Sequence, residues 1–143
     1  EKKISNADVK KIILGLHAIN INIIIILLHK PGDKDWISKL IPNEASLYVF
    51  PSYPTESILD LAAIIDSLDL IISPDTSIVH MACAFNKPLV SIYRRHMSLF
   101  EIWHPISDFN YVVFSDHEDS LKSINVDNIV NKTFKLMQKI QKK

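Results

Sequence analysis

Glycine is scarce in this sequence of 143 residues, which contains only Gly15 and Gly32. A Gly-rich P-loop and the G-x-G-x-x-G dinucleotide fingerprint both require several closely spaced glycines, so both are excluded. Any phosphate site must therefore use the amide groups at the start of a helix, without help from glycine.

Cysteine, an excess of charge and long hydrophobic runs are also lacking. The single cysteine, Cys83, cannot form an internal disulfide, so nothing indicates an oxidising compartment. Sixteen Lys and Arg balance sixteen Asp and Glu, which argues against non-specific nucleic-acid binding, because phosphate contacts need excess basic residues. The most apolar run, 21–28, is too short to span a bilayer, and the N-terminus has no signal-peptide core. We therefore expect a cytoplasmic protein without a transmembrane segment and without a nucleic-acid partner.

What the sequence does contain is an alternation of strand-like and helix-like segments. Such an alternation predicts right-handed β-α-β crossovers and one parallel sheet with helices on both faces, that is, a single α/β, Rossmann-like domain over residues 1–143. Residues 94–109 are expected to form a long polar and aromatic loop. Hydrophobic periodicity predicts helices over 6–17, 33–40, 55–67 (capped by Thr55), 76–85 and 126–139, and strands over 22–28, 46–50, 70–73, 89–93 and 111–114.

The junction at residues 73–80 carries the most chemical information. A buried strand ends at Ser73, and a helix begins almost at once within Asp75-Thr76-Ser77-Ile78-Val79-His80. The unpaired amides and partial positive charge of a helix start attract anions, and the hydroxyl groups add hydrogen-bond donors. His80 lies about one turn further on, so it could also donate to a phosphate or sugar oxygen. The alternative is that the acid caps a helix and the histidine is half-buried without a role.

A metal site is not indicated by the same segment. His80 and Cys83 stand three residues apart, but no second cysteine and no close histidine pair completes a zinc site. We expect neither a metal ion nor another cofactor.

The stretch from Asp75 to Tyr93 resembles the signature of glycosyltransferase family 9, the heptosyltransferases of bacterial lipopolysaccharide core synthesis. The shared pattern is Asp-Thr, two variable residues before His80, an Ala-rich helix, Lys-Pro at 87–88 and a hydrophobic strand. Residues 57–65, 69–72 and 103–105 are also similar to the family, and the resemblance covers about residues 2–105.

The resemblance implies a fold, an activity and a ligand. It implies the GT-B fold, in which two Rossmann-like domains face each other, and this chain looks like the C-terminal, donor-binding domain alone. Asp75, Thr76, Ser77 and His80 would then surround the diphosphate of an ADP-heptose-like donor. The acceptor, a lipopolysaccharide core glycan, and the catalytic Asp would belong to an N-terminal domain that the chain lacks. We therefore expect the isolated chain to bind the donor, without a metal, but not to transfer the sugar. The implied location is the cytoplasm, with peripheral association with the inner membrane as an option.

The resemblance also points to residues in three further segments. A basic residue before the first helix would face the phosphates, which fits Lys2 or Lys3. An acid in the loop after the next strand would hold the nucleoside, which fits Asp33 or Asp35. The segment containing Thr55 and Glu56 would lie near the base. Each has a simpler alternative: a terminal lysine without a role, a first-turn helix acid, and a turn with a cap.

Two departures from the family pattern leave the donor open. The usual glycine after the threonine is replaced by Ser77, and the usual Gly-x-Thr after the next strand is replaced by Arg94-Arg95-His96. Arg94 and Arg95 could bind phosphate through charge-assisted hydrogen bonds, or they could be solvated loop charges. The remaining alternatives are a family member that uses a different nucleotide sugar, a sugar-nucleotide epimerase and a non-catalytic α/β binding module.

Overall fold

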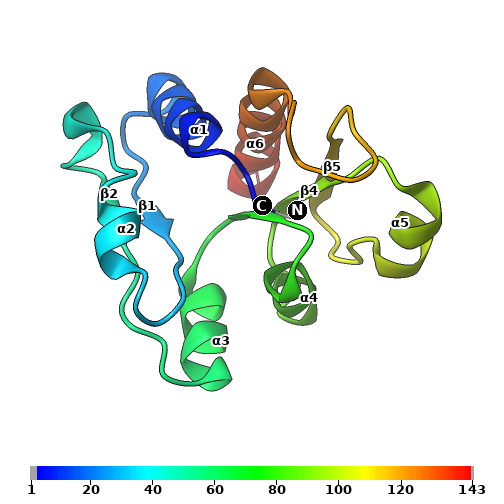
Figure 1. Ribbon diagram of the computed structural model, residues 1–143, viewed down its shortest axis with the longest axis horizontal. Coiled ribbons are helices and arrows are strands. Elements are labelled where there is room, and N and C mark those ends of the chain that lie inside the picture. Colours follow the sequence, from blue (N-terminus) through cyan, green and yellow to red (C-terminus); the bar gives the residue numbers. More distant parts are fainter. Residues whose placement is uncertain (1–2, 143) are drawn as a thin grey trace.

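The computed structural model describes residues 3–142 as an α/β domain in which all the strands are parallel (Figure 1). The helices are α1 (Asn6–Ile19), α2 (Lys34–Ser38), α3 (Ile58–Ser67), α4 (Ser77–Ala84), α5 (Met97–Trp103) and α6 (Val126–Gln141), with a 3₁₀ turn at Asn43–Ala45. The strands are β1 (Ile25–Leu27), β2 (Val49–Pro51), β3 (Ile71–Pro74), β4 (Leu89–Tyr93) and β5 (Asn110–Phe114). The predicted parallel α/β architecture is confirmed.

The prediction of one continuous sheet is wrong in detail, because the strands form two sheets. β1 pairs only with β2, while β3, β4 and β5 form a second sheet in that order. The first strand is shorter than predicted because Asn20 forms a turn in front of it. The Asn20 side chain accepts a hydrogen bond from the amide of Asn22 at 3.0 Å, and its carbonyl accepts one from the amide of Ile23 at 3.5 Å. The strand therefore begins only at Ile25.

The three-stranded sheet is covered by helices on both faces, as predicted. β4 is buried along its whole length, and its side chains alternate between two cores. Val90 and Ile92 pack with residues of α1 and α6, whereas Leu89 packs with residues of α3 and α4. α4 therefore packs with α3 on the face opposite α1 and α6, and it begins shortly after the end of β3.

Helix α1 connects the two sheets. Ile12 and Leu16 belong to the core shared with α6 and the three-stranded sheet, whereas Ile13 packs against β2 and the segment before it. The contact with α6 is close at Gly15, where an added Cβ would lie 2.9 Å from Cγ2 of Val130.

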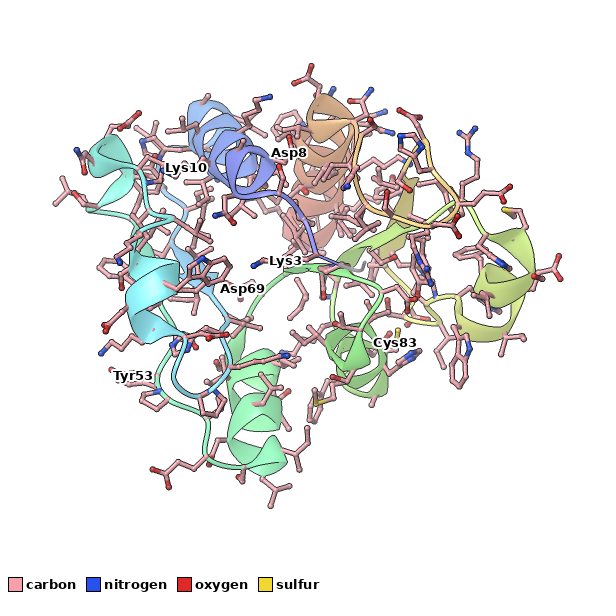
Figure 2. The ribbon with its side chains drawn as sticks, viewed as in Figure 1. Lys3, Asp8, Lys10, Tyr53, Asp69 and Cys83 are labelled. Atoms are coloured by element: carbon pink, nitrogen blue, oxygen red, sulfur yellow. The ribbon has the colours of Figure 1, made fainter. Side chains whose placement is uncertain are left out.

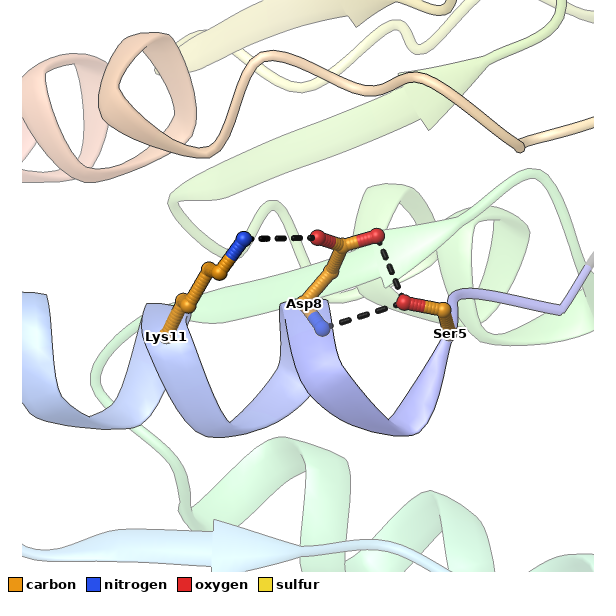
Figure 3. A network of polar contacts seen from close by, with 3 residues as sticks. All are labelled: Ser5, Asp8 and Lys11. Carbon is orange, nitrogen blue, oxygen red and sulfur yellow. Dashed lines mark hydrogen bonds and ion pairs between the residues drawn. The ribbon is translucent and has the colours of Figure 1, made fainter.

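The N-terminus of α1 is fixed by a small polar network (Figure 3). The hydroxyl of Ser5 accepts a hydrogen bond from the amide of Asp8 at 3.1 Å and donates one to its carboxylate at 2.6 Å. Lys11 lies 4.0 Å from the same carboxylate. Ser5 is therefore the N-cap, and it sets the direction in which the preceding residues approach the helix.

The predicted cap of α3 needs correction. Helix α3 is capped by Ser57 rather than Thr55, because Ser57 and Asp60 form a reciprocal capping box in which each side chain accepts a hydrogen bond from the other residue's amide. The buried stripe of α6 is Ile129, Thr133 and Leu136, whereas Phe134 is partly exposed.

The segment 94–109 is not only a loop, because it contains α5. The helix forms around Phe100, whose ring packs at 5.1 Å from the ring of Tyr93 and at 4.9 Å from that of Phe114. His96 occupies its N-cap position without a side-chain hydrogen bond to the helix. A tertiary aromatic contact rather than a capping signal therefore holds this helix.

Candidate functional site

A cleft of about 1500 Å³ opens between the two sheets. The edge strands β1 and β3 contribute to its lining, as do apolar side chains of α1 and α6. Five residues expected at the site line this cleft: Lys3, Asp33, Thr55, Thr76 and Ser77.

The start of α4 faces the cleft. Thr76 is the N-cap, and its hydroxyl accepts a hydrogen bond from the amide of Ile78 at 3.3 Å and lies 3.3 Å from the hydroxyl of Ser73. Ser77, the first residue of the helix, is exposed and lines the cleft. Its amide has no partner within the helix at this position, so the helix start presents donors and partial positive charge to the cleft.

The residue before the cap is placed differently. The amide of Asp75 donates to the carbonyl of Ile92 at 2.9 Å, which extends the β3–β4 pairing by one residue. The side chain of Asp75 is half-buried and does not line the cleft. Its negative charge instead acts on Tyr93, whose pKa is raised well above its usual range, mainly by burial and further by Asp75 and Cys83.

Two lysines line the cleft, Lys3 and Lys30, and Lys3 is the one expected to face the phosphates. Its Nζ lies 4.0 Å from the ring centroid of Trp36, which is a cation–π contact. Figure 2 shows the Lys3 side chain directed towards α2 from the segment that enters α1. Lys2, the other basic candidate, lies outside the described residues.

The loops that follow β1 and β2 are held together by His29. One ring nitrogen, Nδ1, lies 2.8 Å from the carbonyl oxygen of Lys30, and the other, Nε2, lies 3.1 Å from that of Ser52. The histidine therefore joins two loops at the carboxyl ends of neighbouring strands, where ligands bind in sheets of this kind.

The four candidates for the nucleoside side differ in whether they line the cleft. Asp33 is exposed and lines the cleft, and Thr55 is buried and also lines it. Asp35 and Glu56 are exposed but lie outside the lining. The structure therefore brings Asp33 and Thr55 to the cleft lining and leaves Asp35 and Glu56 outside it.

His80, Arg94 and Arg95 lie away from the cleft lining. The ring of His80 packs edge-on against Trp103 of α5, with centroids 5.5 Å apart. The hydroxyl of Tyr93 donates to the carbonyl of Trp103 at 2.7 Å and so fixes the end of α5 beside α4. The amide of Arg95 donates to the carbonyl of His117 at 3.2 Å, which places this pair of arginines beside another loop.

Two cleft residues were not selected from the sequence. Ile37 and Leu40 are buried, whereas Trp36 is half-buried and lines the cleft. His29 joins two loops and also lines the cleft. Both residues come after β1, and residues beyond the carboxyl end of a parallel strand are candidates for ligand binding, so their position in the sequence could have indicated them.

Among residues 3–142, no group of three or more His, Cys, Asp or Glu side chains is placed to hold a metal ion. Within the same part of the chain, no helix has the length and apolar character needed to cross a membrane. The polar groups that line the cleft include two ammonium groups, two carboxylates, a histidine, hydroxyls and the start of α4 (Lys3, Lys30, Asp33, Asp69, His29, Thr55, Thr76 and Ser77). The ammonium groups, the hydroxyls and the helix start suit an anionic ligand with hydroxyl groups.

The fold is shared with solved glycosyltransferases of the GT-B class. The chain superposes on ADP-heptose lipopolysaccharide heptosyltransferase II of E. coli with a TM-score of 0.78 at 19% identity, covering 98% of this chain and 43% of that one. For E. coli heptosyltransferase WaaC with ADP, the TM-score is 0.77 at 17% identity, with 94% and 40% covered. For the same enzyme with ADP-2-deoxy-2-fluoro heptose, the TM-score is 0.71 at 20% identity, covering 94% of this chain and 38% of that one. The chain therefore spans about two fifths of the length of these enzymes.

A family model described as glycosyltransferase family 9 (heptosyltransferase) matches residues 7–133, and the chain belongs to this family. The expected family is thereby confirmed. A comparison with curated proteins found no match.

Proposed function

We propose that this chain is the donor-binding, C-terminal part of a two-domain transferase, and that its cleft holds the diphosphate of an ADP-heptose-like nucleotide sugar. In the whole enzyme the heptose, or a related sugar, is transferred to a lipopolysaccharide core acceptor. The observation that carries the proposal is that Lys3, Thr76 and Ser77 line one cleft at the start of α4.

The chemistry of the transfer explains why these groups are useful. When the bond between the sugar carbon and the phosphate breaks, negative charge grows on the leaving diphosphate. An ammonium, hydroxyl donors and a helix start stabilise that charge without a metal ion. The acceptor hydroxyl also needs a general base within hydrogen-bond reach. We assign that base to the other domain, so the isolated chain should bind ADP without transferring sugar.

The nucleoside side of the cleft is assigned to Asp33 and Thr55. A carboxylate that lines the cleft can accept hydrogen bonds from the hydroxyl groups of a ribose. The bound ADP in one structurally similar heptosyltransferase makes ADP the first ligand to test.

Calorimetry with ADP tests the diphosphate assignment. Lys3→Ala should weaken binding by about tenfold or more, because hydrogen bonds to charged groups contribute about 1.5–3 kcal/mol. Ser77→Ala should weaken it about two- to tenfold, as expected for a hydrogen bond of about 0.5–1.5 kcal/mol. Lys10→Ala is the matched control, because Lys10 is an exposed lysine of α1 outside the cleft lining. Equal affinities of the Lys3 and Lys10 variants would contradict the proposal.

The second candidate is a family member that uses another nucleotide sugar. This alternative is motivated by the sequence departure, because Arg94 and Arg95 stand directly after β4 where the family pattern has Gly-x-Thr, although they lie outside the cleft lining. A thermal-shift screen of nucleotide sugars separates the two candidates. The largest shift with a donor other than ADP-heptose would establish the alternative.

The isolated chain should show no sugar transfer with either kind of donor. Detectable turnover by these 143 residues would refute the assignment of the general base to the other domain.

A further inference from the structure

The indole ring of Trp36 is the one large aromatic surface in the cleft that the proposed function leaves without a role. Trp36 belongs to the five-residue helix α2, is half-buried and lines the cleft together with Asp33. Its neighbour Ile37 is buried and anchors the helix to the core. The helix is therefore anchored beside the cleft while part of the indole remains accessible.

The contact with Lys3 shows which part of the ring is accessible. The ammonium lies over the ring at 4.0 Å from its centroid, so it approaches the flat face and not the edge. Because Lys3 also lines the cleft, this face is reached from the cleft itself. A flat π surface open to a cleft is suited to stack against another flat ring.

We propose that Trp36 is the stacking surface for the nucleobase of the donor, and that the base takes the place of Lys3 on the indole. This inference rests on the proposed function, because it requires a nucleoside diphosphate in the cleft. Asp33, three residues before Trp36 in the chain and in the same lining, is then placed to accept hydrogen bonds from the ribose.

This exchange couples the binding of the base to the binding of the diphosphate. A single ammonium and a base cannot both cover one face of the indole. When the base stacks there, Lys3 is released towards the diphosphate at the start of α4. Stacking on an indole has little preference among bases, so we expect ADP, GDP and UDP to bind within a narrow range of affinities.

The test compares ADP with pyrophosphate, which has the diphosphate but no base. In the wild type, ADP should bind more tightly than pyrophosphate. Trp36→Leu keeps the apolar bulk but removes the stacking face, and it should weaken ADP binding by about 5- to 150-fold. The same variant should bind pyrophosphate as tightly as the wild type or up to about fivefold more tightly, because Lys3 is no longer held by the indole. Trp36→Phe should keep most of the preference for ADP.

Two features of this design separate stacking from a purely structural role. Loss of structure would weaken both ligands together, whereas loss of stacking changes the ratio of their affinities. Tyr111→Leu is the matched control, because it breaks a second cation–π contact, that of Lys139 with Tyr111 at 4.8 Å, away from the cleft lining. That variant should keep the wild-type ratio.

Tryptophan fluorescence gives an independent result that does not require the Leu variant to fold. ADP should quench part of the wild-type emission and pyrophosphate should not, and Trp36→Phe should remove the ADP-dependent change, since only Trp103 then remains. An unchanged ligand ratio in Trp36→Leu, or quenching that persists in Trp36→Phe, overturns this inference while the diphosphate site stands. If the wild type binds neither ADP nor pyrophosphate, the inference and the proposed function are overturned together.

Discussion

Replacing Gly15 by alanine tests how closely α1 and α6 pack around the cleft. Two effects oppose each other at this position. Alanine favours the helix over glycine by about 1 kcal/mol. The added Cβ, however, would lie 2.9 Å from Cγ2 of Val130, and overpacking of this kind costs about 1–3 kcal/mol. Because valine is short and branched, it cannot swing its end away, so we expect Gly15→Ala to lower the free energy of unfolding by up to about 2 kcal/mol.

A double-mutant cycle isolates the contact. In a Val130→Ala background the obstacle is gone, so the same Gly15→Ala change should raise the free energy of unfolding by about 1 kcal/mol. Urea unfolding followed by circular dichroism measures all four proteins, and the difference between the two backgrounds should be about 1–3 kcal/mol. If Gly15→Ala stabilises both backgrounds equally, α1 and α6 do not approach each other as described.

Three further changes test other parts of the structure. Ser5→Ala removes the cap of α1 and should lower the free energy of unfolding by about 1 kcal/mol in urea melts, and it should also weaken ADP binding because Lys3 precedes the cap. Hydrogen bonds from Ser57 lower the pKa of the Asp60 carboxyl group in the folded protein. The charged carboxylate therefore stabilises the fold above its unfolded pKa of about 3.9, and this contribution is lost as the pH falls through the lower folded pKa. The difference in stability between wild type and Asp60→Asn should shrink between pH 7 and pH 3 in thermal melts. Phe100→Ala should destabilise the protein by about 1–3 kcal/mol, measured in urea melts, through loss of the ring contacts with Tyr93 and Phe114, whereas Phe100→Leu should lose less.

The order of helices and strands could be predicted from the sequence because it depends on local signals. Strand β4 has the predicted bounds, and α4 begins within one residue of the predicted start because Thr76 is a good cap directly after a buried strand. The cap of α3 was assigned two residues too early. The correct signal, Ser57 followed by Asp60, was present in the sequence but is recognised only by its reciprocal spacing.

What could not be predicted depends on contacts between distant segments. Helix α5 forms because Phe100 meets Tyr93 and Phe114, and no pattern within residues 94–109 encodes that contact. The separation of the two sheets, likewise, results from tertiary packing. For the site, the helix start at Thr76 was accessible from the sequence, whereas the meeting of Lys3 with Trp36 joins residues 33 positions apart.

The division of the strands also determines which part of the domain opens most easily. A sheet of two short strands is only marginally stable by itself, so β1 and β2 depend on Ile13 of α1 to stay folded. Amide hydrogens of these strands should exchange with solvent faster than those of β4, which is buried between two helical layers. A molecule that touches both walls of the cleft would slow that exchange, and the first half of the chain would become as rigid as the second.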